Sequence, residues 1–270
     1  MILNEAIVKS KNIDNIEEYF DELQVHYRNG MTTDKDLKNI SKALKKEFNL
    51  DAEVYIVENT NKFFGMRVYP SKEEIEKMTI VVVDKENEGL EFESCKEVVI
   101  EIDSQIIKMA TPKEMTATLL HEVGHKAISQ EDLKHIKSLV KAQLLVMGIV
   151  LIPAAIVGVM LLMISLVIFA TLSKPTMLIL NNKRESGADS LSVRYGYGDS
   201  LYSMLNKIQD KVTEDPDKKK RLVNYSLERS IHFGHRKNEI RKTLEDELKK
   251  TDSPYEKKFL EEQLKKVRRK

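Results

Sequence analysis

Hydrophobic residues recur at helical spacing in the first part of the chain. Apolar side chains three or four residues apart form one stripe on a helix, and such a stripe is typical of a helix that covers a core. Two stretches before Asn49 show this spacing: Ile13, Ile16, Tyr19, Phe20 and Leu23, then Leu37, Ile40, Leu44 and Phe48. We therefore predict two amphipathic helices and treat residues 1–50 as an N-terminal unit.

The pattern then changes to short runs rich in β-branched and aromatic residues. Four such runs, at residues 52–58, 63–69, 79–84 and 97–103, are separated by Asn, Gly, Pro or charged stretches. Runs of this kind are typical of strands. They predict a small antiparallel sheet within residues 52–103, and with the helices an α+β fold that is mainly α.

Helical signals return after the sheet. Thr111 can cap free backbone N–H groups, Pro112 suits the first helical position, and Glu114 stands at the third. Together they predict a helix over residues 111–131. A second helix is expected over residues 182–195.

A long apolar run separates these two helices. Leu144 to Leu172 contains no ionisable residue, although charged residues make up 32% of the chain. A run of more than about 18 such residues is read as a membrane segment before it is read as a buried core helix. The run therefore predicts membrane association, and Pro153 within it favours a break between two arms.

Composition narrows the classes of function. The 44 lysines and arginines nearly balance the 43 aspartates and glutamates, so no overall field indicates a nucleic-acid partner. Cys95 is the single cysteine, which excludes an internal disulfide framework and is typical of a reducing compartment. Nothing in the composition specifies an oligomeric state.

The strongest chemical signal is LLHEVGH, within the predicted 111–131 helix. Positions four apart lie on one face of a helix, so His121 and His125 can present ring nitrogens to one tetrahedral zinc ion. Glu122 lies about 100° further round the helix, too far to be the natural third ligand but near enough to hold and deprotonate a water. The expected reaction is hydrolysis of an amide bond, with Glu122 as general base and without a covalent intermediate.

A catalytic zinc site needs three protein ligands and one open position. Glu185 is the best candidate for the third ligand. Asp189, one helical turn later, is placed to accept the remaining ring N–H of a ligand histidine and so to fix its tautomer. Gly187 and Ala188, with Gly124 on the other helix, are small enough to let the two helices approach closely around a metal.

These residues together carry a resemblance. HEVGH, an apolar hairpin and then RESGAD resemble the HtpX and CAAX prenyl protease family of gluzincin metallopeptidases, whose pattern is HExxH and a distal ExxAD, and also their compact relatives, the minigluzincins. The likeness runs from about Ile100 to Leu205. It implies a zincin-like core with one zinc ion. By the same resemblance the zinc ligands are His121, His125 and Glu185, the base is Glu122, and Asp189 supports a ligand.

The family also carries a downstream histidine near the position that stabilises the oxyanion of the reaction. The nearest counterpart is SIHFGHRKNEIRKTL, at residues 230–244, which offers His232 and His235. Phe233 or Arg236 stands where the family has a proline, and the spacing differs by a residue or two. Either histidine could donate to a developing oxyanion. A place on an ordinary polar helix is the alternative for both.

The predicted metal site constrains the apolar run. If the run crossed the bilayer once, Glu185 and His121 would lie on opposite sides of it. A hairpin over residues 136–172 returns the chain to its starting face, and the lysines on both flanks place that face in the cytoplasm. A re-entrant hairpin and a helical pair buried between subunits are the alternatives.

We therefore interpret the chain as a membrane-associated zinc metalloendopeptidase with its active site on the cytoplasmic face. Its units are residues 1–50, a zincin-like catalytic domain at 51–235 with the hairpin inserted, and charged C-terminal helices at 236–270. Its expected partners are the bilayer and a polypeptide substrate. The resemblance implies misfolded or membrane proteins as substrates.

Three further hypotheses follow from the sequence. The strand at 97–103 is a candidate sheet edge for pairing with an extended peptide. A catalytically inactive, membrane-anchored binding or structural protein that keeps the gluzincin fold is one alternative function. A single-span anchor protein with a chance HExxH is another.

Overall fold

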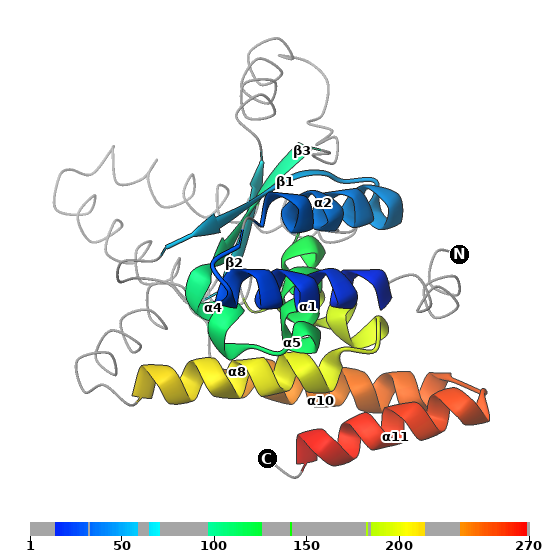
Figure 1. Ribbon diagram of the computed structural model, residues 1–270. Coiled ribbons are helices and arrows are strands. Elements are labelled where there is room, and N and C mark those ends of the chain that lie inside the picture. The colour runs from blue at the N-terminus through cyan, green and yellow to red at the C-terminus, as the bar shows by residue number, and fades with distance from the viewer. Residues whose placement is uncertain are drawn as a thin grey trace, which may run out of the picture.

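The computed structural model describes residues 14–31, 33–58, 65–70, 97–125, 141, 182, 185–213 and 233–268. Within them the fold is mainly helical, with one small sheet (Figure 1). The elements are α1 (Asp14–Arg28), α2 (Asp34–Phe48), β1 (Asp51–Val57), β2 (Met66–Pro70), β3 (Glu97–Asp103), α4 (Ser104–Met109), α5 (Pro112–Gly124), α8 (Gly198–Thr213), α10 (Phe233–Lys250) and α11 (Pro254–Arg268). Residues 185–194 are also helical. The predicted α+β class, mainly α, is confirmed.

The two N-terminal helices form as their apolar stripes predict. Ile16, Phe20 and Leu23 of α1 are buried, as are Ile40 and Leu44 of α2. Asn49 ends α2 in the left-handed conformation, at φ 54°, and its N–H bonds back to carbonyls of the last turn. The chain then enters β1 directly.

The sheet has three described strands in the order β1-β3-β2. β3 runs parallel to β1 and antiparallel to β2, so the sheet is mixed and the prediction of an antiparallel sheet is wrong. The alternation of side chains along a strand predicts which face is buried, but not which neighbour the strand pairs with or in which direction. The predicted strand at 79–84 lies outside the described residues.

The central position of β3 corrects a second expectation. β3 is paired on both sides, with β1 over residues 97–103 and with β2 over residues 98–102. A strand paired on both sides has no free N–H and C=O groups to offer to a peptide. The hypothesis that residues 97–103 form an open edge is therefore wrong.

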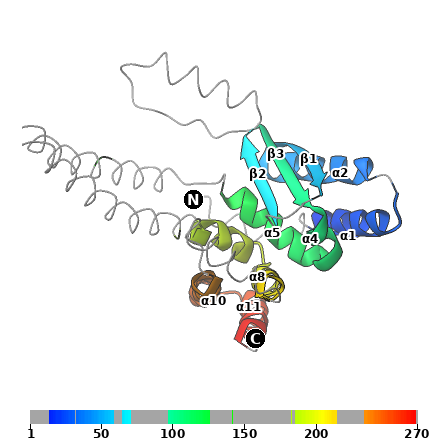
Figure 2. The ribbon, with the colours of Figure 1, turned by 90° about the vertical axis from the view of Figure 1, so that its left-hand side faces the viewer.

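Helix α5 lies between two hydrophobic cores. Met115, Leu119 and Val123 pack with the sheet, α1, α2 and α4, whereas Ala117 and Leu120 pack with α8, α10, α11 and the helical residues 185–194. Figure 2 shows the resulting layers, with the sheet on one side of α5 and α8, α10 and α11 on the other. Because both sides of α5 are covered, almost all of its side chains are buried.

The start of α5 is fixed by the capping box that the sequence predicts. The Thr111 hydroxyl accepts a hydrogen bond from the Glu114 N–H, and the Glu114 carboxylate accepts one from the Thr111 N–H, with Pro112 at the first helical position. Caps of this kind contribute roughly 0.5–2 kcal/mol. Thr111 therefore sets the register in which His121 and His125 follow.

The apolar run at 144–172 and the predicted hairpin at 136–172 lie outside the described residues, apart from Lys141. Among the helices that the structure describes, none combines the length and apolar character needed to cross a bilayer.

Candidate metal centre

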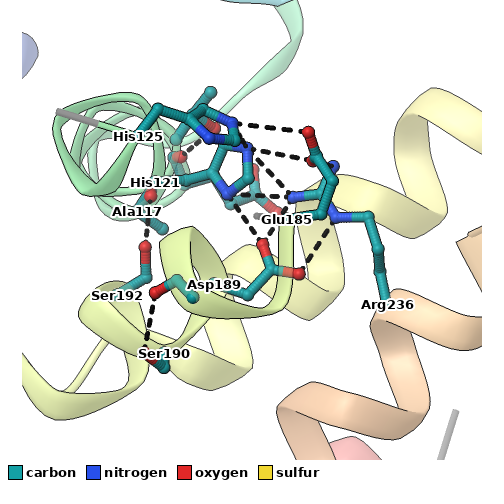
Figure 3. Close-up of polar contacts among 11 residues, drawn as sticks. Ala117, His121, His125, Glu185, Asp189, Ser190, Ser192 and Arg236 are labelled. Carbon is teal, nitrogen blue, oxygen red and sulfur yellow. Dashed lines mark hydrogen bonds and ion pairs between the residues drawn. The ribbon is translucent and has the colours of Figure 1, made fainter. Parts of the chain in front are cut away.

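Two helices bring three possible metal ligands together. His121 and His125 stand one turn apart at the end of α5, and Glu185 begins the helical residues 185–194. The two imidazole rings meet edge to face, with centroids 4.6 Å apart. One ligand atom from each of the three residues lies within 4.8 Å of the others. In Figure 3 both imidazoles are directed toward the Glu185 carboxylate.

The separations between these atoms fit a zinc tetrahedron. The Nε2 atoms of His121 and His125 are 3.1 Å apart. Glu185 Oε2 lies 3.5 Å from the Nε2 of His121, and Glu185 Oε1 lies 3.4 Å from the Nε2 of His125. With zinc–ligand distances of about 2.0–2.1 Å, neighbouring corners of the tetrahedron are roughly 3.3 Å apart. Three protein ligands leave the fourth corner for water or substrate, as a catalytic zinc requires.

The close approach of the two helices depends on Gly124. A Cβ at this position would lie 2.7 Å from the Cα of Ala188 and 2.9 Å from its carbonyl oxygen. Nearer the start of α5, the buried Ser192 hydroxyl donates a 2.8 Å hydrogen bond to the Ala117 carbonyl and links the same two helices. The expected role of Gly124 and Ala188 is confirmed, whereas a Cβ at Gly187 would meet open space, so its expected role is wrong.

Asp189 contacts the ring nitrogen of His121 that does not face Glu185. Its Oδ1 is 2.8 Å from the Nδ1 of His121, and both side chains are buried. An Nδ1–H donated to the carboxylate leaves the lone pair on Nε2, the atom that faces His125 and Glu185. This is the contact that the spacing of Glu185 and Asp189 predicts.

The buried Asp189 carboxylate stays ionised. Burial opposes its ionisation, but the charge of Arg236 and then that of His121, with hydrogen bonds from both, hold the pKa of this carboxyl well below its usual value. An ionised carboxylate here can accept the His121 N–H near neutral pH.

Arg236, at the start of α10, is a site residue that sequence reasoning missed. Its Nε and Nη2 donate to the two oxygens of Asp189 at 3.0 and 2.5 Å, and its Nη1 lies 3.3 Å from a Glu185 oxygen. The sequence did hold a signal: Arg236 shares the buried face of α10 with Ile240 and Leu244, four and eight residues further on. A guanidinium on an apolar stripe needs a buried acidic partner.

Glu122 follows His121 on α5 but is not part of the three-residue cluster, as its angle round the helix predicts. Burial raises the pKa of the Glu122 carboxyl, and the nearby Glu185 adds to the rise. The charges of His121 and Arg236 act in the opposite direction. So does a hydrogen bond that the N–H of Val68, in β2, donates to Glu122. A carboxylate with a raised pKa beside a metal site is suited to accept a proton.

The two downstream histidines, His232 and His235, are the candidates for the oxyanion role. His232 lies outside the described residues. His235 is half-buried near the start of α10, and no hydrogen bond or ion pair within the described part of the chain joins it to His121, His125 or Glu185. The oxyanion role suggested for either histidine stays a prediction.

Two histidines one turn apart, a glutamate from a second helix and a carboxylate behind a ligand are the features of an HExxH-type zinc metallopeptidase site. The family model of Peptidase family M48 matches residues 87–250, more than half of the 270 residues, and the chain belongs to this family. No curated protein and no solved structure matches the chain.

The family assignment confirms the resemblance to HtpX and CAAX prenyl proteases and the prediction of a zinc metallopeptidase. Zinc is the metal expected for this family, and a polypeptide substrate follows from its activity. The roles of individual site residues and the division into three units stay predictions.

Proposed function

We propose that this chain is a membrane-associated zinc endopeptidase whose active site faces the cytoplasm. The observation that carries the metallopeptidase part of the proposal is the convergence of His121, His125 and Glu185, with one ligand atom from each within 4.8 Å of the others, as a zinc site requires. The residues come from two helices that are far apart in the sequence, so the spacing of HExxH alone does not account for their convergence.

Each residue of the site would have its own role in the reaction. When bound, zinc supplies Lewis acidity, which polarises a peptide carbonyl and acidifies water. His121, His125 and Glu185 would hold the ion, and Glu122 would take a proton from the attacking water and pass it to the leaving amide nitrogen. Asp189 keeps His121 in the tautomer whose Nε2 is free to bind metal. His232 or His235 would donate to the oxyanion.

Metal content tests the proposed site. We expect the purified full-length protein to bind one zinc ion, and His121→Ala, His125→Ala and Glu185→Ala each to lose it. His26→Ala is a matched control, because His26 pairs with Asp36 between α1 and α2 rather than with this cluster. A wild-type protein that binds no zinc, or a Glu185→Ala variant that binds it as tightly as the wild type, would contradict the proposal.

The membrane part of the proposal rests on the uncharged run at residues 144–172 and on the lysines at both its flanks. The contact between His125 and Glu185, at 3.4 Å, supports a hairpin, because it requires both flanks of the run to lie on the same side of a bilayer. A single-span anchor places these residues on opposite sides and is inconsistent with that contact.

Labelling of engineered cysteines tests the topology. In a Cys95→Ser background, Ser129→Cys and Ser173→Cys place one thiol on each flank of the run. We expect both thiols to react with a membrane-impermeant reagent only when it reaches the cytoplasmic face. Labelling of the two thiols from opposite faces would exclude the hairpin, and recovery of the protein without membranes after cell fractionation would exclude membrane association.

We further propose unfolded or membrane-embedded polypeptides as substrates, on the strength of the family resemblance. The preference for unfolded polypeptides is tested by the cleavage rates of a model protein in its unfolded and in its folded form. Faster cleavage of the unfolded form supports this preference, and equal rates contradict it.

A further inference from the structure

The guanidinium of Arg236 is buried between the two carboxylates of the proposed zinc site. Its fork faces Asp189, with Nε 3.0 Å from one carboxylate oxygen and Nη2 2.5 Å from the other. The third nitrogen, Nη1, lies 3.3 Å from Glu185. Figure 3 shows the side chain reaching from its own helix toward the residues of the other two.

We infer that Arg236 is a positioning residue that holds Asp189, and through it His121, in the geometry needed to bind zinc. This inference rests on the proposed function, because it assigns a further residue to the same site.

The geometry of the Asp189 carboxylate carries the first step. Two parallel donors from one planar guanidinium fix both the place and the plane of a carboxylate, which a single donor does not do. Oδ1 also accepts from the Nδ1 of His121, at 2.8 Å. Because Arg236 fixes the plane of the carboxylate, it fixes the direction in which Oδ1 meets the imidazole.

The same guanidinium acts on the metal ligand Glu185. The Oε2 atom that lies 3.3 Å from Arg236 Nη1 is also the oxygen 3.5 Å from the Nε2 of His121. Arg236 Nη2 also lies 3.1 Å from the Nδ1 and 3.3 Å from the Nε2 of His121. Arg236 therefore contacts two proposed ligands directly, and it is joined to His121 through Asp189 as well. Its charge also balances acidic groups that would otherwise repel one another in a buried site.

Arg236 belongs to neither metal-binding helix. It is held by α10, whose buried residues Ile240 and Leu244 pack into the core shared with α5, α8 and α11. The packing of α10 therefore sets the position of a group that α5 and residues 185–194 cannot supply themselves. The zinc site is complete only when this C-terminal helix is docked.

Two effects of Arg236 on zinc affinity oppose each other. Its positive charge repels a dication, so removal of the charge alone would tighten zinc binding. Its hydrogen bonds orient the Asp189–His121 pair, so their removal would weaken zinc binding. We expect the second effect to dominate, because the guanidinium charge is already matched by Asp189 and Glu185, which it contacts.

The affinity of the metal-free, full-length protein for zinc separates these effects. We would measure it by competition with a chromogenic chelator for Arg236→Met, Arg236→Lys, Asp189→Asn and the double variant Arg236→Met/Asp189→Asn. Arg241→Met is the matched control, since Arg241 is exposed on the same helix and bonds to Asn238. Thermal unfolding of each metal-free variant reports any effect on the fold itself.

Arg236→Met and Asp189→Asn are each expected to weaken zinc binding by roughly 10- to 100-fold, the range found for groups that orient metal ligands. The double variant should bind about as weakly as either single one, because both changes break the same contact. Arg236→Lys keeps the positive charge but not the two parallel N–H donors, so its zinc affinity should lie between those of Arg236→Met and the wild type. In zinc-saturated Arg236→Lys we expect kcat to fall with little change in KM.

Several results would overturn the inference. Unchanged or tighter zinc binding by Arg236→Met, additive losses in the double variant, or full recovery in Arg236→Lys would each do so. A lower unfolding temperature with wild-type zinc affinity would show that Arg236 only supports the fold. If Arg236→Met does not fold, Arg236→Lys and Asp189→Asn provide the same comparison. A wild-type protein without zinc affinity would instead refute the proposed function itself.

Discussion

Gly124 of α5 lies against the backbone of Ala188, so close that a Cβ at position 124 would be 2.7 Å from the Ala188 Cα. The contact joins the helix that carries both histidines to the helix that carries Glu185. A separation of under 3 Å between such atoms cannot be relieved by rotation of a side chain, because the obstacle is backbone. One helix would have to move.

Replacement of this glycine should therefore damage the metal site. We expect Gly124→Ala to lower the free energy of unfolding by about 1–3 kcal/mol, as overpacking does elsewhere, and to weaken zinc binding by displacing Glu185 from the histidines. Gly187→Ala is the matched control, because a Cβ there meets nothing within 4 Å and alanine favours a helix by up to about 1 kcal/mol. Equal effects of the two substitutions on zinc affinity would contradict this account.

The hydroxyl of Ser192 should contribute to the same helix contact. Ser192→Ala removes the buried hydrogen bond to the Ala117 carbonyl and is expected to cost about 1 kcal/mol in the free energy of unfolding. Ser190→Ala removes a hydroxyl that bonds to Gly187 of its own helix on an exposed side, so it should cost much less. Denaturant unfolding of both variants provides the comparison, and similar midpoints would argue against a specific role for Ser192.

The ion pair between Glu114 and Lys207 should make stability depend on pH. Burial opposes the ionisation of Glu114, but hydrogen bonds from the Lys207 ammonium, the Thr111 N–H and the Ser203 hydroxyl, with the charge of Lys207, lower the pKa of this carboxyl from its ordinary 4.5. The stabilisation is therefore fully present above the unfolded-state pKa and is lost as the pH falls through the folded-state pKa.

Glu114→Gln isolates this effect, since glutamine can still accept the capping hydrogen bond. We expect it to cost about 1 kcal/mol near neutral pH, a modest value because Lys207 is partly exposed. The difference from the wild type should shrink as the pH falls below about 4.5. Unfolding curves over a pH series test this, and a difference that stays constant into acid would exclude the ion pair as its source.

Glu122→Gln tests the proposed general base. Glutamine has nearly the same shape but cannot take up a proton, so peptide hydrolysis should fall by at least roughly 100-fold while zinc still binds. Zinc content and the rate of cleavage of an unfolded protein would be measured on the same preparation. An unchanged rate would refute the role of Glu122, and absence of cleavage by the wild type itself would favour the inactive, membrane-anchored alternative.

The features that the sequence predicted correctly are those set by local spacing. The cap at Thr111 fixes where α5 begins, and the four-residue step from His121 to His125 then fixes that both rings share a face. Glu185 and Asp189 were proposed from the same step on a second helix; they do lie beside His121, and their roles stay predictions. Neither inference needs to know how the two helices pack.

The features that were missed depend on partners distant in the sequence. Strand direction is decided by which neighbour lies on each side of β3, and nothing within residues 97–103 records this. Arg236 was named only as a residue in the place of the family's proline, and its role in the site was missed because it stands beside His235 in a charged segment. Its place on the stripe of Ile240 and Leu244 was the available clue.

The burial of α5 on both sides also bears on how the molecule opens. A helix covered on one side can detach while the rest of the fold persists, but α5 contributes to both cores and cannot separate from one without exposing residues that anchor it to the other. Its amide protons should exchange with solvent only through openings close to global unfolding. The backbone of α5 that carries His121 would then keep its place between the two cores for as long as the protein remains folded.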